Sequence, residues 1–512
     1  MYFAKPNIHL MSTLCLKFQR RTDLPVQTRF LIGFQVVHQN TWGCISDLAR
    51  KYNVSRPFIY ATASIFSSMS AHFFGVRAST SKEVAIDEGL RHLLSLRMEG
   101  KCGLLGISEV MERQNSPYCS VGYISETLHE IGAKIGNSAG LSAVGSHTFE
   151  ICSDEIFAGG RAILITVDPI SLLILRIELV ARRTAEAWSS HWQAIRSEGV
   201  EFSLLVNDEG TSMKAAKDST LTEVERQSDT FHAVAHRFGL FAHRFLVEAY
   251  KAIEQEYDCS RLLANSKTVA TYLKRNQKHI SAKAHARQAI ERYDHFVFLY
   301  HCLLESFQVF DKHGNLKEVQ KVQVDFDTAL QYLLNIPDTS LSQELKSLEA
   351  CKNNLFTFYQ TAANIVQPLA QTVDVEALKA LCLAWQFQKN ALKAKDTQRK
   401  QTYKRREQYL LQEAKDILKD HFENTKNNVY EQLSHIIQSS AAVECINSLL
   451  RPYLNNAKNQ VTQEFLNLFM FYHNNKCFNA GKRKGKSPMQ IATGADTQQD
   501  WIELILQKTA LN

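Results

Sequence analysis

The eleven cysteines of this 512-residue chain include no CxxC pair. The sequence therefore contains neither a disulfide framework nor the spacing of a zinc site, and we expect reduced thiols within protein cores. No apolar run approaches the roughly 18 residues of a membrane-spanning helix. The N-terminus also lacks the basic-then-apolar layout of a signal peptide. These absences predict a soluble, cytoplasmic protein with no membrane partner.

Hydrophobic residues make up 45% of the chain, which is enough for proper cores, and the length suits about two to four domains. The formal net charge is +7 and the pI is near 8.7. A mild basic excess of this kind fits a polyanionic partner, although it does not identify one.

Four short apolar segments have the character of β-strands, at residues 149–157, 162–167, 172–179 and 202–206. An Asp168-Pro169 turn joins the second segment to the third. Between the third and the fourth, Thr184 is a good N-cap for a helix that ends near Gly199. The order β-β-β-α-β predicts the first half of an α/β, RNase H-like core with a mixed five-stranded sheet.

Aspartates end the first and the fourth predicted strands, at Asp154 and Asp208. In an RNase H-like fold these two strands are neighbours, so the two carboxylates would lie side by side. An aspartate at a strand exit is equally typical of a simple turn, so this pair needs a third acid.

Glu444 is the candidate for the third acid. On a predicted helix it shares one face with Arg451 and with either Asn447 or Ser448. The side chains left to pack beneath this face are Val443, Ile446 and Leu450. Pro452 is expected to end or bend the helix.

The sequence around these three acids resembles that of a known protein family. Glu444 with the following NSLLR, then FYHN and the basic GKRKGKSP, is similar to the C-terminal signature of DDE transposases of bacterial insertion sequences. SDEIFAGGR and NDEGTS are similar to the two aspartate blocks of that group. The resemblance covers roughly residues 145–240 and 436–495. It implies that Asp154, Asp208 and Glu444 form the catalytic triad.

Such a triad would bind two divalent ions, Mg²⁺ or Mn²⁺, because magnesium prefers oxygen ligands and because two ions stabilise both oxygens of an in-line displacement. We expect Asp154 to be shared by both ions, Asp208 to bind one and Glu444 the other. Cleavage would leave a 3′-hydroxyl that attacks target DNA, without a covalent protein–DNA intermediate. Neighbouring Glu155 should point to the opposite face of the sheet.

Residues 41–66 have the layout of a helix-turn-helix, with Asn53 at the turn and Ser55 as the cap of the second helix. That helix would present Arg56, Tyr60 and Thr62 to the major groove of DNA. A three-helix packing unit without a ligand is the alternative. Residues 94–135 form either a second, weaker copy or a helical spacer, with a helix capped by Ser120.

The C-terminal part carries further candidate DNA contacts. Lys482, Arg483, Lys484 and Lys486, with interleaved glycines, are interpreted as a mobile basic loop that contacts the DNA backbone. Asn447, Arg451 and Asn474 would orient Glu444 or contact the DNA end. The tail from Thr497 is expected to be an amphipathic helix for packing or self-association.

The segment from 245 to 435 is almost proline-free and has helical spacing, with a break near Pro337. Within it, residues 386–410 carry an excess of positive charge, which either grips phosphates or is a solvated helix face. His232, before this segment, is either a core residue or a support for the catalytic site. The distance from Asp208 to Glu444 in the sequence indicates that a helical insertion splits the core.

The predicted organisation is therefore a leader at 1–37, a helix-turn-helix region at 38–140, a first core part at 145–245, a helical insertion at 246–435, a second core part at 436–495 and a C-terminal helix at 496–512. The resemblance implies a transposase that cuts and joins double-stranded DNA at element ends and target, as a nucleoid-associated homo-oligomer without a small-molecule substrate. The alternatives are a catalytically inactive, transposase-derived DNA-binding regulator and a structural helical protein.

Overall fold

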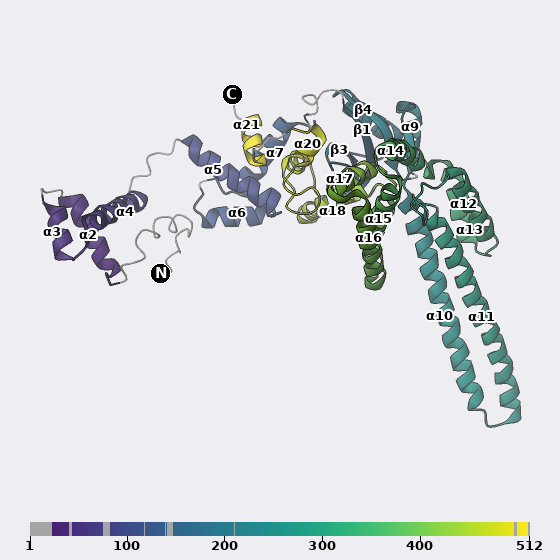
Figure 1. The fold of residues 1–512 in the computed structure, drawn as a ribbon. Coiled ribbons are helices and arrows are strands. Elements are labelled where there is room, and N and C mark those ends of the chain that lie inside the picture. Colours follow the sequence, from purple (N-terminus) through teal and green to yellow (C-terminus); the bar gives the residue numbers. More distant parts are fainter. Residues whose placement is uncertain are drawn as a thin grey trace. The chain divides into compact units, whose positions relative to one another are not determined.

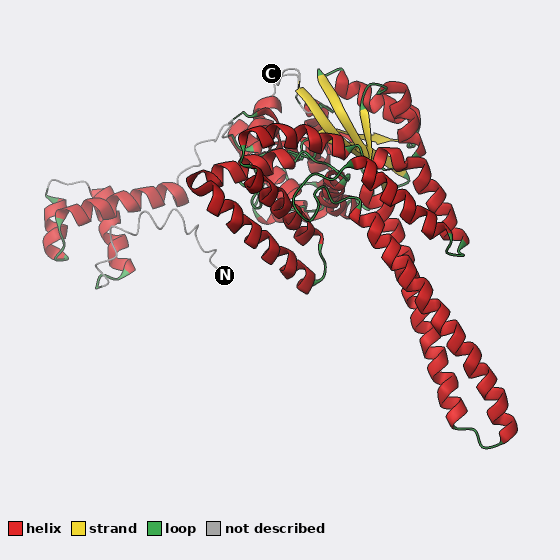
Figure 2. Ribbon diagram, turned by 45° about the vertical axis from the view of Figure 1, so that its right-hand side comes forward, coloured by secondary structure: helices red, strands yellow, loops and turns green. Residues whose placement is uncertain are grey.

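The structure is a computed structural model that describes residues 23–39, 43–74, 82–116, 118–138, 140, 147–208, 210–495 and 499–509. The chain divides into two compact units, Met1–His92 and Leu93–Asn512. Both contain helices, and the second also contains a single five-stranded sheet (Figures 1 and 2). The division falls inside the region 38–140 that the sequence suggests as one DNA-binding region.

The first unit contains the predicted helix-turn-helix, formed by α3 (Cys44–Lys51) and α4 (Arg56–Phe74). Asn53 adopts the left-handed conformation, with φ of 49°, that the turn requires. The Ser55 hydroxyl accepts a hydrogen bond from the Phe58 amide at 3.4 Å, as expected of a cap. A further helix, α2 (Val26–Gln39), packs against α4 although most of it lies in the stretch expected to be a leader.

The sheet of the second unit has the order β3-β2-β1-β4-β5. The first three strands, β1 (His147–Ala158), β2 (Arg161–Val167) and β3 (Ile174–Val180), are antiparallel neighbours. The last two, β4 (Val200–Asn207) and β5 (Glu225–Ser228), run parallel to β1 on its other side. The four strands expected from the sequence are therefore present, and β5 completes the sheet.

The turn between β2 and β3 is built on Asp168. Its carboxylate accepts hydrogen bonds from the amides of Ile170 and Ser171, at 3.0 and 2.9 Å, and from the Ser171 hydroxyl. Leu172, which the sequence places in the third strand, has a φ of 66° and belongs to this turn. Strand β3 therefore begins at Ile174.

Helices cover both faces of the sheet. On one face, α8 (Ala185–Arg196) and α9 (Thr211–Thr220) share a core with the strands, and the Trp188 and Trp192 side chains are fully buried in it. Thr184 caps α8 as expected, accepting a hydrogen bond from the Ala187 amide at 3.2 Å. On the other face lie α18 (Ala441–Asn456), against β1 and β2, and α19 (Gln463–Asn475), against β3.

Helix α18 does not end at Pro452, one of the two outcomes predicted for this proline, but continues to Asn456. A proline inside a helix removes one backbone hydrogen bond, yet packing on both sides of it holds the helix together. Val443, Ile446 and Leu450 are fully buried before it, as the sequence predicts. Tyr453 and Leu454 are buried directly after it, and the Tyr453 hydroxyl donates a hydrogen bond to the Met98 carbonyl.

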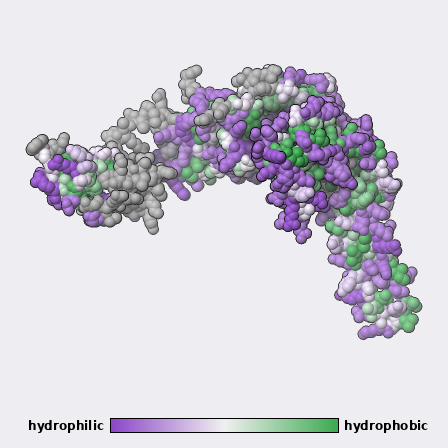
Figure 3. All heavy atoms as spheres, viewed as in Figure 1, coloured by the Kyte–Doolittle hydropathy of each residue, from purple (hydrophilic) through white to green (hydrophobic). Residues whose placement is uncertain are grey.

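Between β5 and α18 the described chain is helical apart from short connections and one isolated bridge. A π-helical turn, η3 (Phe231–His236), leads into α10 (Arg237–Ala264) and α11 (Val269–Glu305), which form a long antiparallel hairpin (Figures 1 and 2). Small side chains pack between its helices, namely Ala249, Ala252, Ala286 and Ala289. Apolar side chains also lie on the surface of the hairpin (Figure 3). Leu262 and Leu273 are examples, with exposed fractions of 50% and 62%.

The rest of the helical insertion surrounds one large core. It consists of α12 (Val319–Leu334), α13 (Thr339–Cys351), α14 (Phe358–Thr372), α15 (Val375–Lys393), α16 (Thr397–Leu418) and α17 (Phe422–Leu433), with single turns η4 (Lys352–Leu355) and η5 (Lys419–His421). The break predicted near Pro337 separates α12 from α13. The basic stretch 386–410 forms the end of α15 and the start of α16.

Upstream of β1 lie α5 (Lys82–Leu94), a π-helical turn η1 (Ser95–Glu99), α6 (Leu104–Arg113) and α7 (Val121–Ile135). Ser120 caps α7 as predicted. Helix α7 packs against α19, and at Gly132 an added Cβ would lie 2.0 Å from the Glu464 carbonyl oxygen. Helix α7 therefore packs closely within the sheet-bearing unit.

The chain ends with α20 (Pro488–Thr493) and α21 (Trp501–Thr509). Trp501 and Ile505 of α21 are buried, so the tail helix packs within its own unit. None of the helices that the structure describes is long and apolar enough to cross a membrane. The ten cysteines within the described residues are all free, but only Cys152, Cys351 and Cys382 are buried, so most are not the core thiols we expected.

Candidate active site

Two carboxylates lie at one edge of the sheet because β1 and β4 are parallel neighbours. Cys152 of β1 is in register with Val206 of β4. Asp154 and Asp208 follow these partners by two residues each, so the chain brings both aspartates to the same end of the strand pair. The Asp208 carboxylate accepts a hydrogen bond from the Gly210 amide at 2.9 Å, which fixes its turn.

The third acid reaches this edge on α18. Asn447 is 2% exposed, and its side-chain amide donates a hydrogen bond to the Asp154 carboxylate at 3.4 Å. Glu444 lies one helical turn before Asn447, with its side chain partly exposed. The three acids predicted from remote parts of the sequence therefore gather in one region of the molecule.

The neighbouring acidic side chains affect the pKa of Asp154. Burial, opposed by a backbone hydrogen bond from Glu155 and assisted by the negative charges of Glu155, Asp208 and Glu444, raises the pKa of Asp154 to about 7. The Arg183 guanidinium also interacts with the Asp154 charge, but it does not outweigh burial. A divalent cation bound beside Asp154 would favour the ionised form of this carboxyl group.

Glu155 has its own positive partner. Arg183, in the segment between β3 and α8, donates a hydrogen bond to the Glu155 carboxylate. Alternation along β1 directs Glu155 toward the α8 side while Asp154 faces α18, in agreement with the prediction. Glu155 therefore borders the acidic cluster without facing α18.

Arg226 of β5 is a residue that sequence reasoning missed. Its guanidinium donates to the Asn207 side chain at 2.9 Å and to the Asp208 carbonyl at 3.1 Å. It is 7% exposed and holds the turn that carries Asp208. Only the pairing of β5 with β4 brings it there, so no local pattern could have identified it.

His232 lies beside the third acid. Its Nε2 atom is 3.8 Å from a carboxylate oxygen of Glu444. Of the two roles considered from the sequence, core residue or supporting residue, this position is compatible with the second, since His232 is only partly buried.

A cavity of about 580 Å³ opens next to Glu444 and His232. Phe231 on its wall is 52% exposed. Lys389 and Lys393 of α15 also line this cavity. The Lys389 ammonium lies 4.2 Å from the centre of the Trp385 ring. Burial, with the charges of Lys393 and Lys482, lowers the pKa of Lys389 to about 7.

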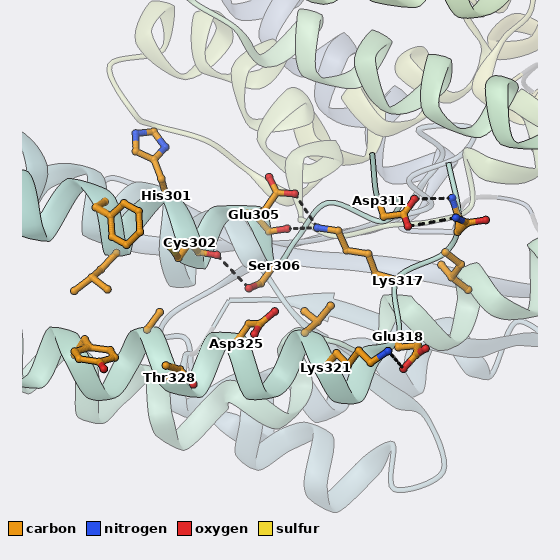
Figure 4. A pocket seen from close by; sticks show the side chains of 17 residues that line it. His301, Cys302, Glu305, Ser306, Asp311, Lys317, Glu318, Lys321, Asp325 and Thr328 are labelled. Carbon is orange, nitrogen blue, oxygen red and sulfur yellow. Dashed lines mark hydrogen bonds and ion pairs between the residues drawn. The ribbon is translucent and has the colours of Figure 1, made fainter. Parts of the chain in front are cut away.

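A larger cavity, of about 940 Å³, lies between α11 and α12 (Figure 4). Two of its carboxylates are paired with lysines: Lys317 contacts Glu305 at 2.8 Å and Lys321 contacts Glu318 at 2.9 Å. Asp311 is engaged by the backbone and side chain of Asn315. None of the predicted site residues lines it, so its size does not mark it as the functional site.

The basic loop, which we expected to be mobile, is held by hydrogen bonds within the molecule. The Arg483 side chain donates to the Pro169 and Ile170 carbonyls, at distances of 2.6 to 3.1 Å, and thereby grips the β2–β3 turn. The Gly485 amide donates to the Phe478 carbonyl at 2.8 Å. Arg483 is thus engaged within the molecule, while three lysines of the loop remain exposed, namely Lys482, Lys484 and Lys486.

Two predicted DNA contacts have other roles. Asn474 is 1% exposed. Its side-chain oxygen accepts a hydrogen bond from the Ile174 amide and its side-chain nitrogen donates one to the Ile174 carbonyl, both at 2.9 Å, so it pairs with the edge of β3 as a neighbouring strand would. Thr62 is 8% exposed, and its hydroxyl donates to the Phe58 carbonyl at 2.7 Å. The remaining candidates Arg56, Tyr60 and Arg451 are exposed.

Comparison with known proteins gave no match to this chain, either among protein-family models or among curated proteins.

Proposed function

We propose that this chain is a DDE-type transposase that binds the ends of a mobile DNA element and catalyses metal-dependent strand cleavage and strand transfer. The observation that supports the proposal most directly is the gathering of Asp154, Asp208 and Glu444. They come from β1, β4 and α18, and the last two both raise the pKa of the first. A carboxyl group with a raised pKa beside two other acids is typical of a functional site.

The sheet supports an RNase H-like core as the second part of the proposal. Three antiparallel strands are followed by two parallel ones, and the first and fourth strands are neighbours. This is the arrangement on which the expected pairing of Asp154 with Asp208 depended. The helical insertion then enters after β5 and returns at α18.

Asp154 and Asp208 would hold one divalent ion, and Asp154 and Glu444 the other. Bound there, the two ions would stabilise charge on the attacking and leaving oxygens of a phosphodiester. Within the described residues no group of three or more His, Cys, Asp or Glu side chains is arranged around a single ion. The proposed sharing requires only two carboxylates for each ion, because magnesium keeps several waters and takes phosphate oxygens as ligands.

The surrounding side chains have supporting roles in this proposal. Asn447 holds the Asp154 carboxylate in place, and Arg226 fixes the turn of Asp208. Arg451 and the exposed lysines of the basic loop would contact the DNA backbone, while Arg56 and Tyr60 of α4 would read the element end. Joining two ends suggests that the protein works as a homo-oligomer on DNA.

The test is a cleavage assay on labelled element ends with magnesium. Wild-type protein should nick the ends, whereas Asp208→Asn and Glu444→Gln should bind the same DNA without nicking it. Binding without nicking by the wild type would favour the catalytically inactive regulator. Absence of both binding and nicking would favour a structural helical protein.

A further inference from the structure

Asp229, the first residue after β5, is a buried carboxylate with partners on two elements. It is 2% exposed. One carboxylate oxygen accepts hydrogen bonds from the amides of Phe231 and His232, at 2.7 and 3.0 Å. The other accepts from the amide and the hydroxyl of Ser440, at 2.8 and 2.5 Å. One side chain thus joins the end of β5 to a residue 211 positions later in the chain.

Ser440 is the N-cap residue of α18, the helix that carries Glu444. Its hydroxyl makes no capping bond to α18 and instead donates to Asp229. Thr230 strengthens the same junction, because its amide and hydroxyl both donate to the Gln438 carbonyl, at 3.0 and 2.9 Å. Two adjacent residues at the exit of β5 therefore hold the start of α18 from outside the helix.

Other elements hold the same short segment. Lys389 of α15 donates to the Ile436 carbonyl at 3.3 Å, and Gln438 donates to the Phe307 carbonyl at 2.7 Å. The Cys152 thiol of β1 lies 3.9 Å from the Ser439 carbonyl. Residues 436–440 are thus fixed between the sheet and the helical insertion, immediately before the helix that carries Glu444.

We propose that Asp229 is a positioning residue that sets the place of Glu444 relative to Asp154 and Asp208. The role assigned to Glu444 rests on the proposed function, but the contacts of Asp229 do not. A helix rises about 1.5 Å and turns about 100° with each residue, so a small slip at Ser440 displaces the Glu444 carboxylate. A catalytic group displaced by about 1 Å loses on the order of 100-fold in rate.

The chain provides a matched control in Asp168. This carboxylate is also buried, at 4% exposure, and also accepts hydrogen bonds from backbone amides and a serine hydroxyl. The hydrogen-bond partners of its carboxylate are all within three residues of it, in the β2–β3 turn. Asp168→Asn should therefore destabilise the fold much as Asp229→Asn does, without releasing the start of α18.

Hydrogen–deuterium exchange of the full chain tests the inference without relying on catalysis. In Asp229→Asn the amides of residues 440–445 should exchange faster than in wild type, because an asparagine retains one acceptor oxygen and the Ser440 side of the junction loses its charge-assisted bonds. In Asp168→Asn these amides should exchange as in wild type. Unchanged exchange at 440–445 in Asp229→Asn, or equal acceleration in both variants, would overturn the inference.

Nicking of element ends supplies the second readout. The magnesium concentration for half-maximal nicking should rise about 10- to 100-fold in Asp229→Asn, as is usual when the support of a metal ligand is lost, and should stay unchanged in Asp168→Asn.

If wild-type protein does not nick DNA, the proposed function fails, and exchange alone decides whether Asp229 positions α18. If Asp229→Asn does not fold, Thr230→Val, which loses only the hydroxyl bond to Gln438, should show the same changes at smaller size.

Discussion

At the scale of single residues, Asp154 has the most informative environment in the molecule. Burial and the neighbouring charges of Glu155, Asp208 and Glu444 work in the same direction and raise its pKa to about 7. In an unfolded chain the same carboxyl has its ordinary pKa of 3.8. Between these two values the folded protein binds a proton that the unfolded chain has released, so folding is progressively penalised as the pH rises.

Asp154→Asn should therefore stabilise the metal-free protein above pH 7. The substitution removes a penalty that is absent below the ordinary pKa and complete above the folded pKa, with an upper limit of about 4 kcal/mol for a shift of this size. Chemical denaturation of both proteins across the pH range should show the two curves converging at pH 4. Equal stability of both proteins at pH 8 would contradict the assigned environment of Asp154.

Glu178 of β3 shows the opposite behaviour. Burial opposes its ionisation, but hydrogen bonds from His191 and Arg176 outweigh burial and lower the pKa of Glu178 to about 2. Burial also lowers the pKa of His191, so this histidine is neutral at pH 7. It then donates from Nδ1 to Glu178 and accepts from the Thr166 hydroxyl, at 3.0 and 3.1 Å, and Arg176 supplies the positive charge.

Glu178→Gln should accordingly destabilise the protein at pH 7 by about 1–3 kcal/mol, the usual worth of a hydrogen bond to a charged group. Because the folded pKa is depressed, this contribution is present above the ordinary pKa of Glu178 and is lost as the pH falls toward 2. Urea denaturation at pH 7 and at pH 3 should therefore show a smaller difference at the lower pH. A difference that grows on acidification would disprove the assignment.

At the scale of elements, α7 and α19 meet at a contact that only glycine allows. A Cβ at Gly132 would lie 2.0 Å from the Glu464 carbonyl oxygen, which belongs to the backbone and cannot rotate away. Gly132→Ala should therefore push the two helices apart at a cost of about 1–3 kcal/mol or more.

Gly122, on the same helix, is the matched control, since a Cβ there meets no atom within 4 Å. Gly122→Ala should leave stability unchanged or raise it by up to about 1 kcal/mol, because alanine is the better helix former. Thermal unfolding of both variants measures the difference. Similar melting temperatures for the two variants would mean that α7 does not pack on α19 in solution.

Elements with strong local patterns could be predicted from the sequence, and elements fixed by remote contacts could not. Apolar runs and the caps Thr184 and Ser120 identified strands and helices because their signals lie within a few residues. The continuation of α18 past Pro452 could not be predicted because helix propensity is local, whereas the burial of Tyr453 is set by packing on distant residues. Asn474 misled the prediction because its role depends on lying beside the edge of β3.

The same distinction applies to the candidate site. Asp154, Asp208 and Glu444 could be selected because each has a recognisable local context, but the residues that hold them could not. Arg226 reaches the Asp208 carbonyl through the pairing of β5 with β4. Asp229 accepts a hydrogen bond from Ser440, which follows the helical insertion in the sequence. Such partners are visible only once the chain is folded.

At the scale of the whole molecule, the chain divides into a helix-turn-helix unit and a sheet-bearing unit, and the proposed activity divides with it. Recognition of the element end would belong to the first unit and cleavage to the second. Variants in the first unit should therefore change binding to the element end without changing strand nicking, and variants of the site in the second unit should change nicking.

Arg56→Ala and Tyr60→Ala should each weaken binding to the element end by about 1–3 kcal/mol, because both side chains are exposed at the start of α4. Thr62→Val is the control on the same helix: Thr62 is buried and its hydroxyl is used by the Phe58 carbonyl, so binding should be unchanged. Fluorescence anisotropy at a fixed salt concentration measures the affinities, and nicking at saturating protein should be retained in all three. Weaker binding by Thr62→Val than by Arg56→Ala would mean that a different face of α4 contacts DNA. Loss of nicking in these variants at saturating protein would contradict the division of roles between the two units.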